Sequence, residues 1–443
     1  FTFKQIGGVM DANSPHDILI LPPFNDQGRY DEVSLANDVS LQDGSEYKIT
    51  FNARDPAGNV SSPVFVNNIL YDITAPVIET TAPEANSYLR EMNVQYILDE
   101  QLVMGQINIM QRMGTSDISS PHLIQLKGEQ LLLGEHQIDV LEHIELVSGA
   151  EYVVQIFGQD RAGNSSVVLE VGQLVFDIEP PDLKIFSPLF ETKVNNTIVG
   201  FNIGERLLDL SIKWIDKDGT EQLKNLPEKY FLPDKYNQVI VTEPPTLVNG
   251  KKYTIKLKGT DMAGNIAETQ IDNIEYDITP PVFEMISPKD NSYQNNTNLA
   301  FNISEQLKEG RVIWKAVGGK SDPISPKNIE LSPNELINGI SLPVDLTHQT
   351  QLQDGSIYQI SIIGIDLAGN SGESLLVNNF HFDTTPPVIQ LLSPGNDSYV
   401  NHDNANFSIN ETLKSGKITW KRIEGEIDPN IHVVELKGDM LKK

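Results

Sequence analysis

The chain has 443 residues, no cysteine, and 61 acidic against 33 basic residues, which gives a formal net charge of −28. So acidic a surface repels nucleic acid and anionic membranes, and the lack of cysteine excludes a disulfide scaffold and a thiolate metal site. Plain solubility explains the charge, and so does binding of divalent cations. With 39% apolar residues and no long apolar stretch, we expect globular modules without a membrane span.

One set of phrases recurs four times along the chain. It consists of Leu-x-x-Gly-x-x-Tyr, Asp-x-Ala-Gly-Asn and an aromatic-Asp-x-x-x-Pro linker, and the corner tyrosines are Tyr47, Tyr152, Tyr253 and Tyr358. An interval of about a hundred residues is too long for a solenoid unit and matches an independently folding module. We therefore expect whole modules at 73–177, 178–277 and 278–383, with partial modules at 1–72 (from strand C onward) and 384–443.

Within a module the sequence predicts short strands and no sustained helix. Segments 299–304, 311–317 and 358–365 alternate apolar with polar residues and are separated by turn residues, as in an antiparallel β-sandwich. The Leu-x-x-Gly-x-x-Tyr phrase predicts a tyrosine corner, the hallmark of an immunoglobulin-like sandwich. We expect the buried strand C position to be filled by Phe3, Ile109, Trp214, Trp314 and Trp420. The predicted fold is all-β, with tandem immunoglobulin-like antiparallel β-sandwiches forming an elongated rod.

The modules resemble the bacterial immunoglobulin-like repeats of large cell-surface proteins and adhesins. The resemblance rests on Asp-x-Ala-Gly-Asn eight residues after the corner Tyr, as from Tyr47 to Asp55, and on Phe/Tyr-Asp-x-Thr-x-Pro; together these phrases span the chain. It implies an extracellular or cell-surface, non-enzymatic stalk, often stiffened by calcium between domains. Such repeats also serve as spacers in extracellular enzymes.

The spacing of acidic residues predicts metal sites at the module junctions. From the linker Asp72 to Glu100 of a Glu-x-Leu phrase the count is 28 residues, and the other copies keep it. If Glu-x-Leu opens the B–C loop and Asp-x-Ala-Gly-Asn forms the F–G loop, both lie at the end where strand A enters, beside the preceding linker Asp. Converging oxygen donors suit a hard cation such as calcium. The predicted ligands are Asp72, Glu100, Asp160 and Asn164; Asp177, Glu205, Asp261 and Asn265; Asp277, Glu305, Asp366 and Asn370; and Asp383 with Glu411.

The same motifs also have a purely structural interpretation. Asp-x-Ala-Gly-Asn is a hairpin turn with Gly at positive φ, and Asp-x-Thr-x-Pro is a stiff linker. Turn chemistry explains the Glu less well, because carboxylates at a fixed short distance repel one another. The sequence leaves the calcium and the turn-only interpretations open.

Catalytic patterns are missing or weak. The eight histidines are not expected to recur in register, and no nucleophile elbow, His-Glu-x-x-His or phosphate loop occurs. We therefore expect no enzyme but a structural or adhesive stalk or surface fibre, whose partners are other modules of the same longer chain. The alternatives are an accessory spacer region of a secreted polysaccharide-degrading enzyme and a self-assembling surface filament or sheath subunit, which would make the chain a homo-oligomer.

Overall fold

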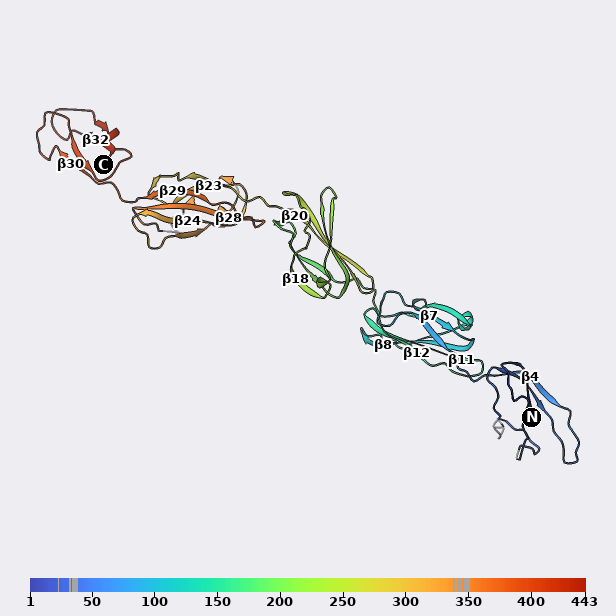
Figure 1. Ribbon diagram of the computed structural model, residues 1–443. Helices are drawn as coiled ribbons and strands as arrows, with labels where there is room; N and C mark the ends of the chain where they lie inside the picture. The colour runs from blue at the N-terminus through green and yellow to red at the C-terminus, as the bar shows by residue number, and fades with distance from the viewer. Residues whose placement is uncertain (23, 32, 34–38, 338, 341–343, 346–350) are drawn as a thin grey trace.

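The computed structural model describes residues 1–22, 24–31, 33, 39–337, 339–340, 344–345 and 351–443. Its sandwiches follow one another in a line, with the two chain ends at opposite extremities (Figure 1). The regular structure in the described ranges is β-strand apart from five short 3₁₀ helices. This confirms the predicted all-β rod of tandem immunoglobulin-like sandwiches. None of the described helices is long and apolar enough to cross a membrane. Each module is named by the residue range that the sequence predicts for it.

Module 73–177 consists of two sheets packed face to face. One sheet has the order β10-β7-β5 and the other β6-β12-β11-β8-β9, which corresponds to strands E-B-A and A′-G-F-C-C′ of an immunoglobulin-like sandwich. The short β6 runs parallel to β12, whereas the remaining pairs are antiparallel. The elements are β5 (Ile78–Ala82), β6 (Tyr88–Leu89), β7 (Asn93–Leu98), β8 (Leu102–Gly114), β9 (His122–Gln125), η1 (Gly128–Leu131), β10 (Gly134–Asp139), η2 (Val140–Glu142), β11 (Ala150–Asp160) and β12 (Leu169–Phe176).

The next two modules repeat this topology, with a short A′ strand again parallel to strand G. Module 178–277 contains β13 (Leu183–Ser187), β14 (Lys193–Val194), β15 (Val199–Ile203), β16 (Leu207–Asp216), β17 (Glu221–Asn225), η3 (Glu228–Tyr230), β18 (Asp234–Val239), β19 (Lys252–Asp261) and β20 (Ile266–Tyr276). Module 278–383 contains β21 (Phe283–Ser287), β22 (Tyr293–Gln294), β23 (Asn298–Ile303), β24 (Leu307–Gly319), β25 (Lys327–Glu330), η4 (Pro333–Glu335), β26 (Gly339–Ile340), β27 (Val344–Asp345), β28 (Ser356–Asp366) and β29 (Leu375–Phe382).

The outer segments contain parts of the same pattern. Segment 1–72 forms one sheet of order β2-β1-β3-β4, equivalent to C′-C-F-G. Segment 384–443 forms two pairs, β30 with β31 and β32 with β33, equivalent to A with B and C with C′. The elements are β1 (Thr2–Gly8), β2 (His16–Asp17), β3 (Ser45–Phe51), β4 (Val64–Tyr71), β30 (Ile389–Ser393), β31 (Asn406–Ile409), β32 (Lys417–Trp420), β33 (His432–Glu435) and η5 (Gly438–Leu441).

The alternation in the sequence places the core. Along β28, buried residues alternate with half-buried ones, and each of the three large buried clusters draws on residues of one module. Segments 299–304, 311–317 and 358–365 coincide with β23, β24 and β28, as predicted. Ile109 on β8, Trp214 on β16 and Trp314 on β24 are buried on strand C, as predicted. Phe3 and Trp420 are only half-buried, because the described outer segments contain only part of a sandwich to cover them.

The tyrosine corner is present in every copy of the phrase. The backbone N–H of Val147 donates to the hydroxyl of Tyr152 at 2.9 Å, and the N–H of Val248 donates to Tyr253 at 2.8 Å. The same bond reaches Tyr47 and Tyr358. These buried hydroxyls fix the turn before strand F, which confirms the prediction.

A buried Asp adds a second bond to three of the four tyrosines. The hydroxyls of Tyr47, Tyr152 and Tyr358 donate to Asp11, Asp117 and Asp322 in the loop after strand C, at 2.5, 2.7 and 2.6 Å. The same carboxylates lie 2.5 Å from His16 Nε2, 2.6 Å from His122 Nε2 and 2.9 Å from Lys327 Nζ. In module 178–277, whose loop is shorter, Asp216 pairs with Lys251 instead, at 3.0 Å.

The expectation that the histidines do not recur in register is therefore wrong at this position. His16, His122 and His432 lie opposite the strand C residues Phe3, Ile109 and Trp420. Lys327 lies opposite Trp314 in the same way. The lysine and a loop of variable length hide the repeat until the strand register is known.

The corner tyrosines differ in the number of hydrogen bonds that their hydroxyls form. Removing the hydroxyl should therefore lower the free energy of unfolding by different amounts. Tyr253→Phe removes one buried bond and should destabilise its module by about 1–2 kcal/mol. Tyr152→Phe also leaves the buried Asp117 with one donor fewer, so we expect the larger loss, about 2–3 kcal/mol. Hydrogen exchange resolved by module measures both. Equal losses, or losses spread over all modules, would contradict this account.

The corner also predicts a response to acid. Burial alone would raise the pKa of Asp117, but hydrogen bonds from His122 and Tyr152 outweigh it and hold that pKa below its usual range. A lowered folded-state pKa contributes stability above the unfolded pKa of about 4, and that stability is lost as the pH falls through the folded value. Between pH 6 and pH 3, module 73–177 should lose hydrogen-exchange protection. The loss should be smaller in Asp117→Asn, where this titration is absent; equal losses would exclude Asp117 as the cause.

Candidate metal centre

Two linker Asp residues, Asp177 and Asp277, are held by the same hydrogen bonds to both neighbouring modules. The N–H of Asp177 donates to the carbonyl of Leu89 on strand A′ at 2.8 Å, and the next N–H, of Ile178, donates to Ser148 Oγ in the E–F loop at 3.1 Å. The carbonyl of Asp177 accepts from Asn265 Nδ2 of the following module at 3.0 Å. Asp277 repeats all three bonds, with Val194, with Asn249 through Ile278, and with Asn370. The linker therefore leaves each module in a fixed direction.

The F–G turn places the second carboxylate. Asp160 Oδ1 accepts from the N–H groups of Gly163 and Asn164, and Oδ2 accepts from Asn164 Nδ2 at 2.7 Å. Gly163 has a φ of 99°, which favours glycine. Asp55 and Asn59 form the two Asp–Asn bonds of this turn in segment 1–72, on an exposed loop. Among the described residues, this turn therefore forms without a bond to a linker carbonyl.

The B–C loop places the third carboxylate, that of the Glu. Glu100 stands between Leu98, the last residue of β7, and Leu102, the buried first residue of β8. Its neighbour Asp99 accepts from the N–H of Val77 at 2.8 Å and so ties the start of strand A to this loop. Ser304 and Asn410 make the same bond to strand A in their modules. The Glu is thereby directed at the incoming linker.

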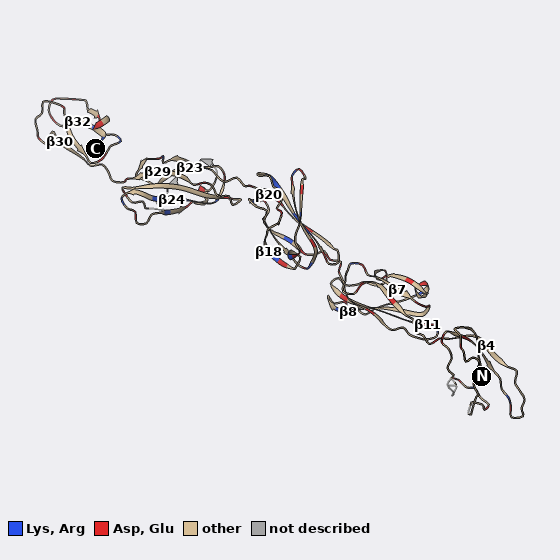
Figure 2. Ribbon diagram, viewed as in Figure 1, with Lys and Arg blue, Asp and Glu red and all other residues tan. Residues whose placement is uncertain are grey.

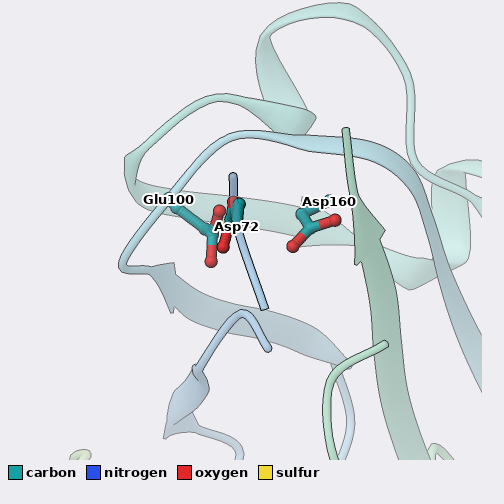
Figure 3. A group of neighbouring side chains, drawn as sticks. All are labelled: Asp72, Glu100 and Asp160. Atoms are coloured by element: carbon teal, nitrogen blue, oxygen red, sulfur yellow. The ribbon is translucent and has the colours of Figure 1, made fainter. Parts of the chain in front are cut away.

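The three carboxylates meet at every junction that the described chain completes. Oxygens of Asp72, Glu100 and Asp160 all lie within 4.8 Å of one another (Figure 3). Asp177, Glu205 and Asp261 form the second such group, and Asp277, Glu305 and Asp366 form the third. The F–G Asp is buried in each group, and the Glu is half-buried. Two modules contribute to each group, because the linker Asp belongs to the preceding one.

Repulsion in these groups is concentrated on the Glu. Burial, followed by the charges of Asp72 and Asp160, raises the pKa of Glu100. Burial and the equivalent Asp pairs raise the pKa of Glu205 and of Glu305 in the same order. Asp160 is the opposite case, because hydrogen bonds from Asn164 and the turn outweigh its burial and lower its pKa. The Glu is therefore the group that a bound cation would relieve most.

The remaining predicted ligands have other surroundings. In the structure, Nδ2 of Asn164, Asn265 and Asn370 holds the linker carbonyl, so metal ligation by these residues stays a prediction that concerns their Oδ1 atoms. Asp383 and Glu411 join no group of three in the described ranges. The sequence contains no Asp-x-Ala-Gly-Asn phrase after Glu411 to supply a third carboxylate.

Sequence reasoning missed the residue that holds the linker from the E–F loop. Asp43, Ser148, Asn249 and Asp354 all accept from the N–H that follows a linker Asp. A signal was present: the residue before Gly in Leu-x-x-Gly carries a side-chain oxygen in all four copies. Asp and Glu residues also occur along the whole rod (Figure 2), so charge alone does not mark the junctions.

No family model and no curated protein matches the chain. Among solved structures, a tetra-tandem repeat in the extending region of a large adhesion protein is 16% identical, covers 80% of this chain and 84% of that one, and has a TM-score of 0.26. A 1.5-MDa bacterial ice-binding adhesin is 10% identical and covers 70% and 100%, with a TM-score of 0.26. Fibronectin(III)-like modules of Clostridium thermocellum CbhA are 15% identical and cover 46% and 95%, with a TM-score of 0.25. These likenesses assign no ligand to this chain.

The Asn that holds the linker carbonyl gives a direct test of the junction. Asn265→Asp keeps the side chain's shape but replaces the donor with an acceptor facing Asp261 and the carbonyl of Asp177. We expect it to destabilise module 178–277 by about 1–3 kcal/mol and to cost more than Asn265→Ala.

Asn59→Asp is the matched control, because Asn59 holds the same kind of turn on an exposed loop and donates to no linker carbonyl among the described residues. Urea unfolding measures stability, and the distance between spin labels on modules 73–177 and 178–277 measures orientation. If Asn265→Asp leaves both unchanged, the side chain does not hold the junction.

Proposed function

We propose that the chain is part of an extracellular stalk whose modules are locked in line by calcium at their junctions. The observation that carries this proposal is the recurrence of one three-carboxylate group at three successive junctions, built each time from the linker, the B–C loop and the F–G loop. Because the modules follow one another in a line, the chain spans a long distance and does not fold back into a compact unit (Figure 1). Such a stalk projects an adhesive or catalytic end away from a cell surface.

Calcium fits the donor set better than other common metals. The groups offer carboxylates, and the adjoining backbone and Asn oxygens extend the supply toward the six to eight oxygens that calcium takes. Zinc favours nitrogen and sulfur, and the chain has no cysteine. Extracellular calcium-binding modules work at dissociation constants of about 10⁻⁴–10⁻³ M. Sites of that affinity are filled outside a cell and empty inside it.

The proposed ion couples binding to module orientation. The linker Asp177 belongs to one module, whereas Glu205 and Asp261 belong to the next, so an ion shared by the three ties the modules together. Without an ion, three negative charges within 4.8 Å repel one another, and swinging the next module away reduces the repulsion. Asp383 and Glu411 would supply two carboxylates to a fourth junction of this kind.

A calcium titration of the whole chain tests the proposal. Glu205→Gln keeps the size of the side chain and removes its charge. In isothermal titration calorimetry, it should lower the number of calcium ions bound per chain by one. It should also reduce the fall in melting temperature that a chelator causes in the wild type, since one junction no longer depends on the metal.

Glu243→Gln is the control for charge, because Glu243 is exposed in the same module and outside the group. It should leave the number of bound ions unchanged. A wild-type chain that binds no calcium at 10-fold above the expected dissociation constant, about 10⁻² M, would refute the proposal. So would a Glu205→Gln variant with undiminished stoichiometry.

A further inference from the structure

The third junction differs from the second in holding a lysine. Lys193, on strand A′ (β14), places its Nζ 2.9 Å from Asp277 Oδ2 and 2.9 Å from Glu275 Oε1. Asp277 is the linker carboxylate of the group with Glu305 and Asp366. The Lys193 side chain is 31% exposed and that of Asp277 is 9% exposed, so the pair is largely shielded from solvent. An ammonium group thus already contacts a carboxylate of the proposed calcium site.

The strand register shows that this lysine is particular to one module. Lys193 pairs with Glu275 where Tyr88 pairs with Val175 in module 73–177, so neither charge exists at the second junction. Arg90 is a cation near that junction, but it donates to the carbonyl of Gly264 at 3.3 Å. Among the described residues, Asp277 is the only carboxylate of the three junction groups that forms an ion pair with a Lys, Arg or His side chain.

The charge of Lys193 reaches two carboxylates of the third group, Asp277 and Glu305. Oxygens of Asp277 and Glu275 each lie 2.9 Å from the Nζ of Lys193 and favour its charged form. Its charge is also one of the influences on Glu305, where it opposes the effect of the two Asp charges. A second contact crosses the same junction without a metal, since Asn195 Nδ2 donates to Asn370 Oδ1 at 3.2 Å.

We propose that Lys193 is a built-in counter-ion that holds the third junction in line without calcium and weakens calcium binding there, so that the rod's junctions respond to calcium unequally. The inference rests on the proposed function for the first two junctions. A divalent ion approaching Asp277 meets the ammonium charge and competes with it for the same oxygen. On removal of calcium, the rod bends at Asp177, whereas modules 178–277 and 278–383 remain aligned.

Spin-label distances on the whole chain test this, and the absence of cysteine makes labelling selective. Ile118→Cys with Leu232→Cys reports on the second junction, and the equivalent pair Lys217→Cys with Ile337→Cys reports on the third; all four positions are exposed. In the wild type, chelator should broaden the distance distribution of the first pair and leave that of the second pair narrow.

Lys193→Met removes the charge and keeps the stem, and Lys193→Arg is the control that retains the charge. Lys193→Met should make the third junction broaden with chelator and should tighten its calcium binding about tenfold or more, as expected for removing a unit charge near a divalent ion. Lys193→Arg should behave as the wild type. Glu100→Gln with Glu205→Gln isolates the third site for the affinity measurement.

The outcomes separate this inference from the proposed function. If the second junction responds to calcium and the third responds equally in the wild type, the role of Lys193 is refuted and the stalk proposal stands. An unchanged third junction in Lys193→Met refutes it as well. If calcium affects neither junction in any variant, the proposed function fails, and the inference that rests on it fails too.

Discussion

The geometry of the rod depends on one hydrogen bond that recurs across the junctions, from the F–G Asn of one module to the linker carbonyl of the module before it. Its length is 3.2 Å at Asn164, 3.0 Å at Asn265 and 2.8 Å at Asn370. The same amide also holds the F–G Asp, so the turn and the junction share one side chain. Because a buried donor is costly to leave unpaired, the turn forms its full set of bonds only when the linker is in place. Local turn chemistry thereby sets the relation between modules about a hundred residues apart.

These neutral bonds bring the three carboxylates together and leave their charges uncompensated, except at the third junction, where Lys193 pairs with Asp277. The F–G Asp is stabilised by donors from its own turn, and the linker Asp is fixed through its backbone. The B–C Glu has neither kind of support, and burial together with the two Asp charges raises its pKa. A turn and a stiff linker alone would form equally well with a neutral residue at the Glu position. The Glu is therefore the residue that separates a metal-binding junction from a purely structural one.

The sequence predicted the fold class, the strand C and corner residues, and the meeting of Asp72, Glu100 and Asp160, because each follows from fixed spacing within a known topology. It did not predict which groups hold the linker. Ser148 and Asn249 are different residue types, and their common task appears only when the E–F loop is placed beside the linker. Nor did it predict the recurrence of His16 and His122, since Lys327 takes the same place in module 278–383. Partners that change identity between copies are hard to find in a repeat pattern, since at best a shared chemical property, such as the side-chain oxygen before the Gly, recurs.

Module 178–277 shows how far such exchange of partners can go. Its corner loop pairs Asp216 with Lys251 where the other modules join an Asp to the corner Tyr, and its strand A′ places Lys193 on the linker carboxylate. At the corner loop and at the linker, the carboxylate is retained, and the group that forms a hydrogen bond or ion pair with it differs from that in the other modules. A carboxylate fixed by backbone geometry can accept from a hydroxyl, an imidazole or an ammonium, provided that the partner reaches it from a neighbouring strand. Since the backbone positions the carboxylates in all modules alike, single substitutions on strand A′ can change how one junction is neutralised without changing the fold.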